Sequence, residues 1–284
     1  MLLLILNLFI LNSKDNNYLE NNKIQDKYFY YYNNHLGYND NYTLEEIQNM
    51  SYILHNSNKF RKRKDLNIEI NSIDYRDING KSFLPEIEDQ GHCGSCVAYT
   101  VNYYIESLYL LKKNKIIDLN KNDLFFCEGR RTCLEGWNIG KASDVAKTKG
   151  VRLKDYCEYN IPINKCYQKI NKINYSSTKN TKIKIKNYIF LNNINLIKDW
   201  LIYNSPVMSR LNVYSDLFSY NGGIYTKKSN NYIADHSVLI VGFNDKEEYW
   251  IGMNSWGKCW GEEGFFRIKY GESGILPYAY VFTI

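Results

Sequence analysis

The chain has 284 residues, of which 44% are hydrophobic and 23% are charged, so it can bury a sizeable core and is not disordered throughout. Its net charge of +6 comes from 36 Lys and Arg against 30 Asp and Glu. A surplus this small does not favour nucleic acid as a partner.

The chain begins with an apolar run, Leu2–Leu11. Such a run is too short to cross a bilayer, which needs about 20 residues, but it fits the apolar core of a secretory signal. We therefore predict a signal peptide over residues 1–18, no stable membrane span, and entry into the secretory pathway toward a lysosome, a vacuole or the cell exterior. The alternative is a partly buried N-terminal strand or helix.

Residues 19–70 are polar and form a leader ahead of the main domain, which we assign to residues 71–284. Thr43 and Glu46 have the spacing of a capping box and predict a helix from Thr43 to about Leu54. The basic run Phe60–Lys64 is either a solvated linker or a processing site, and the sequence favours neither.

The main domain opens with a helical part. A helix beginning near Ser95 places Val97, Val101, Ile105 and Leu108 on one stripe, which predicts a buried helix. Lys182–Phe190 alternates like a half-buried strand.

Strands dominate the last part of the chain. Ile194–Tyr203 predicts a short helix that ends at Asn204-Ser205-Pro206, and Ser237–Phe243 and Glu248–Met253 predict two strands joined at 244–247. Helices first and strands afterwards predict an α+β fold in two lobes.

Cysteines mark the most informative segment, Gln90-Gly91-His92-Cys93-Gly94-Ser95-Cys96. Cys96 falls in the first turn of the predicted buried helix, where backbone N–H groups and the helix dipole favour an anion, so we expect a lowered pKa for its thiol. The Gln90 side chain and the Cys96 N–H could together form an oxyanion hole.

A nucleophilic thiol also needs a base, and the chain has four histidines. His35 and His55 lie in the leader, and His92 is held beside Cys93, which leaves His236. A hairpin turning at 244–247 would place His236 opposite Ser255.

That register brings Asn254 within one residue of His236. An Asn side-chain oxygen there could fix the tautomer and orientation of the imidazole. Trp256 would shield this hydrogen bond from water.

These motifs match a known family. Residues 73–284 resemble the papain-like cysteine peptidases in I-D-Y-R-D, Q-G-H-C-G-S-C, D-H-S-V-L-I-V-G-F and N-S-W-G-K-C-W-G-E-E-G-F-F-R-I. The spacing agrees as well, with 140 residues from Cys96 to His236 and 18 more to Asn254. The resemblance implies a two-lobe fold with a helical N-terminal lobe and an antiparallel, β-barrel-like C-terminal lobe.

The same resemblance implies the roles of the site residues. Cys96 would be the nucleophile and His236 the base, while Asn254 would orient His236 and Gln90 would serve the oxyanion hole. The substrate would contact five further residues: Gly136, Trp137, Met208, Ala234 and Trp256. With no acidic residue evident at the base of its main specificity pocket, we expect a bulky apolar residue at P2, the second residue on the acyl side of the scissile bond.

The resemblance further implies disulfides Cys93–Cys133 and Cys127–Cys166, with Cys157 and Cys259 unassigned. Seven cysteines leave at least one thiol unpaired within the chain. Residues 19–70 would be a shortened inhibitory prosegment, so we expect a latent precursor that is activated by cleavage near 64–70.

Departures from the family pattern bear on specificity. Val97 stands where the family has an aromatic residue, and Glu135 adds a carboxylate that either favours basic substrate groups or is simply solvated. Some features resemble cathepsin B, but no insertion after Cys133 resembles its occluding loop. We therefore expect an endopeptidase that acts through a covalent acyl-enzyme on peptides and proteins, without cofactor or metal, as a monomer that cystatin-like inhibitors could bind.

Three alternatives remain at this point. Cys93 and Cys96 could be a redox-active pair, although the βαβ pattern that usually surrounds such a motif is missing. Cys93, Cys96, Cys127 and Cys133 could be four thiolate ligands of a structural zinc ion, although five residues separate the second pair. The protein could also be a catalytically silent papain-fold binding protein.

Overall fold

The computed structural model describes residues 70–154 and 182–284, which belong to one compact unit of the chain, Ile53–Ile284. The predicted signal peptide, the leader up to residue 69, and Cys157 and Cys166 lie outside the described residues. The disulfide predicted between Cys127 and Cys166 therefore stays a prediction.

The predicted buried helix is present as α4, Cys96–Lys113. All four residues of its apolar stripe are buried, and Tyr104 beside them donates and accepts hydrogen bonds in the core. The helix ends at Asn114, which adopts a left-handed conformation and returns its N–H to Leu110 O, as C-terminal caps commonly do. Two lysines in its last turn complement the helix dipole.

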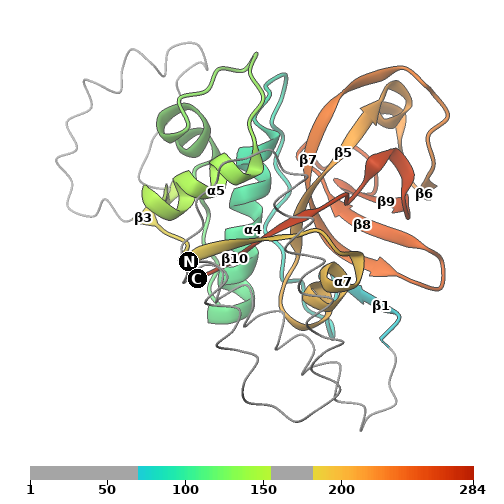
Figure 1. The fold of residues 1–284 in the computed structure, drawn as a ribbon, viewed down its shortest axis with the longest axis horizontal. Helices are drawn as coiled ribbons and strands as arrows, with labels where there is room; N and C mark the ends of the chain where they lie inside the picture. The colour runs from blue at the N-terminus through green and yellow to red at the C-terminus, as the bar shows by residue number, and fades with distance from the viewer. Residues whose placement is uncertain (1–69, 155–181) are drawn as a thin grey trace, which may run out of the picture. The chain divides into compact units, whose positions relative to one another are not determined.

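The other helical elements of the first part lie beside α4 (Figure 1). They are a π-helical turn, Asp123–Glu128, and helix α5, Ile139–Thr148, whose N-terminus is capped by the Asn138 side chain accepting from Lys141 N. The short strands β2, Val151–Arg152, and β3, Lys182–Ile183, pair with each other.

A large sheet makes up the second part of the fold. Its strand order is β4-β10-β5-β7-β8-β9-β6, with β1 also paired to β7, and all neighbours are antiparallel except β6 and β9. The strands are β1 Ser72–Asp74, β4 Asn187–Leu191, β5 Val207–Tyr214, β6 Ile224–Tyr225, β7 Tyr232–Asn244, β8 Tyr249–Met253, β9 Phe265–Lys269 and β10 Ala279–Thr283.

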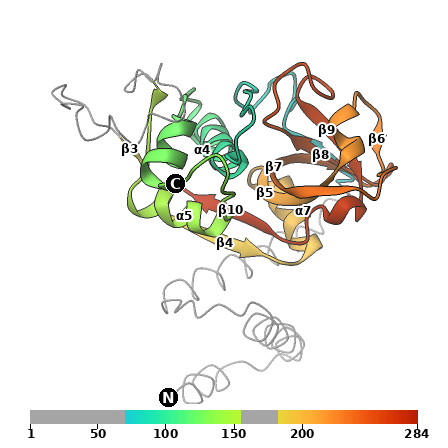
Figure 2. The same ribbon diagram turned by 90° about the horizontal axis from the view of Figure 1, so that it is seen from above.

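Both ribbon views place α4 and α5 on one side and β6, β8 and β9 on the other, with β10 between them (Figures 1 and 2). Helix α4 packs against β7 and β5. The backbone N–H of Phe282 in β10 donates to Tyr104 Oη of α4 at 3.0 Å, so the last strand also joins the two parts. The α+β arrangement in two parts predicted from the sequence is therefore present.

Two local predictions need correction. Lys182–Phe190 is not one strand. Its first residues form β3, which pairs with β2 only up to Ile183, and pairing with β10 begins at Asn187 in β4. The buried Ile185 lies between these strands, and its N–H donates to Ala146 O.

The β7–β8 hairpin also has a different register. Placing His236 opposite Ser255 would pair Phe243 with Glu248, but Phe243 pairs with Trp250, and the register shifts between Ile240 and Gly242. The helix α7 matches its predicted bounds, Ile194–Tyr203, and Asn193 caps it by accepting from the N–H groups of Asn195 and Leu196.

A buried charge cluster stabilises the segment after α4. Lys121 Nζ donates to Glu106 Oε1 and to Glu88 Oε1, each at 2.8 Å, and both Lys121 and Glu106 are buried. Burial raises the pKa of Glu106 to about 7, and the two carboxylates raise the pKa of Lys121. Lys121, which follows α4, thus joins Glu106 in the middle of this helix to Glu88 in the loop before it.

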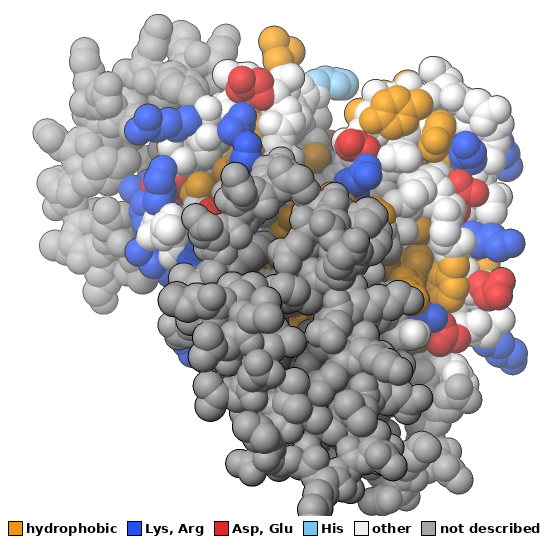
Figure 3. Space-filling view, viewed as in Figure 1, with side chains coloured by type: hydrophobic (Ala, Val, Ile, Leu, Met, Phe, Trp, Pro, Cys, Tyr) orange, Lys and Arg blue, Asp and Glu red, His pale blue; other side chains and the backbone are white. Residues whose placement is uncertain are grey.

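The surface of the described residues carries charges of both signs. On the face in Figure 3, Lys and Arg side chains lie at several separate places with Asp and Glu among them. Among the described helices, none is both long and apolar enough to cross a membrane.

Candidate active site

Cys96 is the first residue of α4, directly after the buried Ser95. It is partly accessible and makes no disulfide. The backbone amide of Ser237 in β7 forms a hydrogen bond that lowers the pKa of the Cys96 thiol. The start of α4 therefore lies against the strand that carries His236. The first turn of α4 therefore lies beside the residue that follows His236 in β7, which is the arrangement that a Cys96–His236 pair needs.

The expected lowering of the Cys96 pKa is not found. Burial raises the pKa of the thiol, and the opposing effect of the backbone amides of Ser237 and Val97 is smaller. Desolvation penalises the thiolate more than the helix N-terminus stabilises it. Burial therefore favours the protonated thiol form of Cys96 over the thiolate.

His236 is buried, and its Nε2 lies 2.7 Å from Asn254 Oδ1. The same Oδ1 accepts from the Ser255 N–H at 2.8 Å. An amide oxygen can only accept, so Nε2 carries the hydrogen and the neutral imidazole keeps its lone pair on Nδ1. Burial lowers the pKa of His236 to about 4, against the opposing effect of the Asn254 hydrogen bond.

Aromatic rings cover this pair. Trp256 lies on His236 with a centroid distance of 4.8 Å, and Phe218 stacks on Trp256 at 5.1 Å. Trp260 meets Trp256 edge to face at 4.9 Å. These rings keep water from the His236–Asn254 hydrogen bond, which strengthens it.

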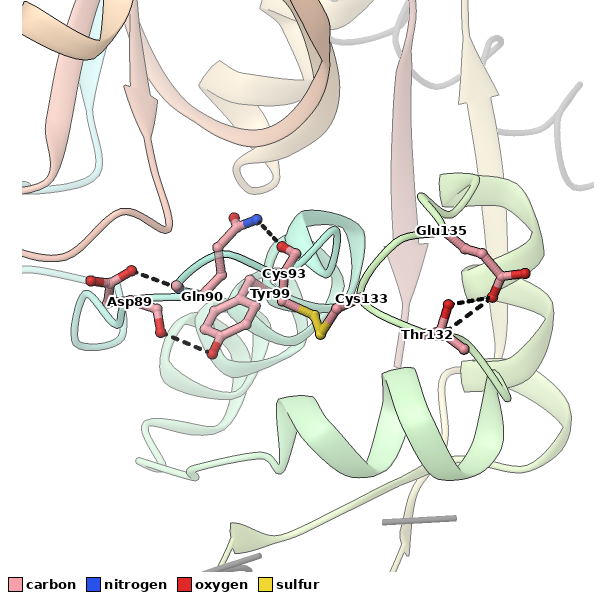
Figure 4. Close-up of a disulfide and its surroundings, with 8 residues drawn as sticks. Asp89, Gln90, Cys93, Tyr99, Thr132, Cys133 and Glu135 are labelled. Atoms are coloured by element: carbon pink, nitrogen blue, oxygen red, sulfur yellow. Dashed lines mark hydrogen bonds between the residues drawn. A yellow bond between two sulfur atoms is a disulfide. The ribbon is translucent and has the colours of Figure 1, made fainter. Parts of the chain in front are cut away.

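Gln90 is fixed to the segment that carries Asn254. Its backbone N–H donates to Ser255 O at 2.9 Å, and its side-chain Oε1 accepts from Ser255 Oγ at 2.5 Å. Asp89 and Trp256 form a β-bridge beside these bonds. The amide nitrogen of Gln90 donates to Cys93 O at 2.7 Å (Figure 4), and since this nitrogen carries two hydrogens, one is left for a ligand.

The disulfide Cys93–Cys133 holds the loop before Cys96 to the loop that carries Gly136, as predicted (Figure 4). Gly94 lies against this second loop, and a Cβ at that position would come within 3.0 Å of Glu135 O. Glu135 Oε2 accepts from Thr132 N and Thr132 Oγ1, so its carboxylate closes its own turn (Figure 4). The interpretation of Glu135 as a solvated surface charge fits this arrangement.

The residues predicted to contact substrate differ in exposure. Gly136 and Ala234 are exposed, and Trp137 is half-buried against Phe125. Met208, in contrast, is completely buried between Leu239 and Tyr280 of the neighbouring strands. The structure therefore gives Met208 no surface that a bound peptide could contact.

The sequence analysis missed two neighbours of the site. Ser255, which holds Gln90, stands in the N-S-W motif, where its position between Asn254 and Trp256 was the available signal. Arg210 lies on β5 opposite Ser237, and its Nη1 donates to Asp235 Oδ1 at 2.6 Å. Arg210 had no sequence signal, since the alternation of β5 only predicts that it faces outward.

The zinc alternative is incompatible with the disulfide. Cys93 and Cys133 are bonded to each other, so neither is a thiolate ligand. Within residues 70–154 and 182–284, no group of three or more His, Cys, Asp or Glu side chains has the arrangement of a metal site.

Comparison with known proteins agrees with this geometry. The family model described as "Papain family cysteine protease" matches residues 70–281, which is most of the chain. The chain belongs to this family. The papain-family chain is 34% identical to a cysteine proteinase of Theileria annulata over 200 residues, which are 66% of this chain and 42% of that protein. It is 31% identical to a viral cathepsin of Cydia pomonella granulosis virus over 201 residues, 70% of this chain and 57% of the relative.

The chain thus spans about half the length of these curated relatives. Two solved structures share its fold. A cysteine protease of Carica candamarcensis, solved in complex with E-64, has a TM-score of 0.61 at 24% identity and covers 76% of this chain and 99% of its own. The proCathepsin B of Trypanosoma congolense has a TM-score of 0.65 at 21% identity and covers 78% of this chain and 80% of its own.

Proposed function

We propose that this papain-family protein is a cysteine endopeptidase that hydrolyses peptide bonds through Cys96, His236 and Asn254. The observation that carries the proposal is the His236–Asn254 hydrogen bond, which leaves Nδ1 as the basic nitrogen of an imidazole on the strand that contacts the Cys96 thiol. A nucleophilic thiol needs such a base, held by a third group.

The lone pair on His236 Nδ1 defines the first step. His236 Nδ1 takes the thiol proton as Sγ attacks the substrate carbonyl, and the imidazolium that forms is stabilised by Asn254 Oδ1. The Cys96 N–H and the remaining Gln90 side-chain N–H stabilise the oxyanion. His236 then protonates the leaving amine, and water hydrolyses the thioester.

This chemistry also orients the substrate. Besides Cys96 Sγ, the attacked carbon carries three groups: the carbonyl oxygen, the leaving nitrogen and the acyl chain. The oxygen is directed to Gln90 and the nitrogen to His236. The acyl chain takes the remaining direction, away from Ser255, to which Gln90 is tied.

Processing and location complete the proposal. Residues 19–70 act as an inhibitory prosegment, and cleavage near 64–70 releases the activity. The protein travels through the secretory pathway to a lysosome, a vacuole or the cell exterior, acts there on peptides and proteins as a monomer, and can be bound by cystatin-like inhibitors. Cathepsin-named relatives support the general route.

A covalent probe tests the proposal. Full-length protein, activated by cleavage near 64–70, is treated with an epoxysuccinyl thiol probe, and the intact mass is read for wild type, Cys96→Ala, His236→Ala and Cys259→Ala. Cys259 is an exposed free thiol without a catalytic role in the proposal, so Cys259→Ala provides the matched control.

We expect one adduct on wild type and Cys259→Ala, none on Cys96→Ala, and much slower reaction of His236→Ala. Peptide hydrolysis should follow the same order. Folded wild type without any adduct would contradict the proposal and favour the silent binding protein. Equal peptide hydrolysis by uncleaved and cleaved protein would contradict the inhibitory role of residues 19–70.

A further inference from the structure

We propose that Arg210 makes this protein select substrates with Asp or Glu at P2. This inference rests on the proposed peptidase function and concerns which peptides the site accepts. It replaces the expectation of an apolar P2 residue, because Met208, one of the residues expected to contact substrate, is completely buried.

The position of Arg210 relative to the catalytic residues follows from the strand order β5-β7-β8. His236 lies on the middle strand, Asn254 follows β8 on one flank, and Arg210 lies on β5 on the other flank. Arg210 pairs directly with Ser237, whose backbone amide acts on the Cys96 thiol. Arg210 is therefore one strand away from the reacting sulfur, on the side opposite Ser255.

That side is where the acyl chain must extend. The oxyanion is directed to Gln90, which is tied to Ser255, and the leaving nitrogen is directed to His236. An extended peptide advances about 3.3 Å per residue, so the P2 residue lies roughly 7 Å from the attacked carbonyl. Neighbouring strands are about 4.8 Å apart, and the long Arg210 side chain covers the remaining distance.

The guanidinium group has donors available for a ligand. Its Nη1 donates to Asp235 Oδ1 at 2.6 Å and to Asn212 Oδ1 at 3.2 Å. Within the described part of the chain, Nε and Nη2 have no hydrogen-bond partner. These two nitrogens form one edge of the guanidinium fork, which matches the two oxygens of a carboxylate.

The surroundings keep this edge in place and in contact with solvent. The Arg210 side chain is 35% exposed, and its guanidinium lies over the Tyr278 ring, 5.9 Å from the ring centroid. Asp235 compensates the charge of Arg210, so discrimination comes from directed hydrogen bonds and not from a positive field. The site should consequently prefer Glu over Gln at P2 through the second carboxylate oxygen.

The experiment compares peptides that are identical except for Glu, Gln or Leu at P2. The protein is the full chain activated by cleavage near 64–70, and kcat/KM is measured for wild type, Arg210→Met and Arg76→Met. Arg76 is a matched control, because it is a similarly half-exposed arginine in an ion pair with Asp74 and lies in the turn that follows β1. Melting temperature and probe labelling verify that each variant is folded and carries a reactive Cys96.

We expect wild type and Arg76→Met to favour Glu over Gln roughly tenfold or more, as hydrogen bonds to a charged group commonly do. Arg210→Met should lose this preference and favour Leu, while iodoacetamide, which is too small to fill the P2 site, still alkylates its Cys96. Wild type that favours Leu, or that does not distinguish Glu from Gln, would overturn the inference even if the variant failed to fold. Absence of both labelling and hydrolysis in wild type would instead contradict the proposed peptidase function.

Discussion

The buried imidazole of His236 predicts that the folded protein loses stability in acid. Its pKa is about 4 in the folded state, whereas an unperturbed histidine in the unfolded chain has a pKa of about 6.5. Between these values the unfolded chain binds a proton that the folded protein does not, so acidification favours unfolding. His236 contributes its full stabilisation above pH 6.5 and loses it progressively down to pH 4.

The magnitude follows from the size of the shift. A difference of one in pKa corresponds to about 1.4 kcal/mol, so the lowered pKa of His236 reduces the free energy of unfolding by about 3 kcal/mol between pH 7 and pH 4. This is a large part of the roughly 5–15 kcal/mol that stabilises an ordinary domain.

Urea unfolding at pH 7 and pH 4 measures the effect. Cys96→Ser prevents self-cleavage, and the double variant Cys96→Ser/His236→Gln removes the titrating ring while its amide can still donate to Asn254. Cys96→Ser should lose about 3 kcal/mol more on acidification than the double variant. Equal losses, or an NMR titration of His236 with a midpoint at 6.5 or above, would refute the reasoning.

Two further predictions concern stability and catalysis. Lys121→Met leaves the buried Glu106 carboxylate without its cation and should lower the free energy of unfolding by about 3–5 kcal/mol at neutral pH, whereas Glu106→Leu/Lys121→Met should recover most of it in chemical denaturation. Recovery of nothing in the double variant would argue against an uncompensated charge as the cause. Ser255→Ala removes the hydroxyl that holds Gln90 and should lower kcat about tenfold while leaving Cys96 alkylation by iodoacetamide unchanged. Alkylation that slows in parallel would mean that Ser255 supports the nucleophile and not the oxyanion hole.

The sequence predicted those parts of the fold that depend on local pattern. The apolar stripe of α4 and the end of α7 are properties of single segments: α4 begins one residue from the expected start, and α7 has the expected bounds. The approach of His236 to Asn254 was also predicted, because a hairpin of any nearby register brings the two strand ends together.

The features that the sequence did not predict depend on tertiary packing. The side chains of Ser237–Phe243 are mostly apolar on both faces of the sheet, so no alternation of polar and apolar residues fixes the register of this strand. The register shift before Gly242 therefore has no signal in the sequence. Gly242 also lies where a Cβ would come within 2.2 Å of Ile73 O of β1. The pKa of Cys96 is raised, whereas the sequence predicted that it is lowered. The prediction considered only the N-terminus of the helix and not the burial of the thiol against β7. Arg210 reaches the site only through the pairing of β5 with β7.

The Cys93–Cys133 disulfide has a consequence for biosynthesis. Cys93 leaves the ribosome 40 residues before its native partner, but Cys96 follows only three residues behind it. Because a ribosome adds about 5–20 residues per second, Cys93 and Cys96 are both present for roughly 2–8 s before Cys133 is synthesised. A bond between these two neighbours would trap the nucleophile, so in an oxidising compartment the yield of active protein depends on thiol exchange that returns Cys93 to Cys133.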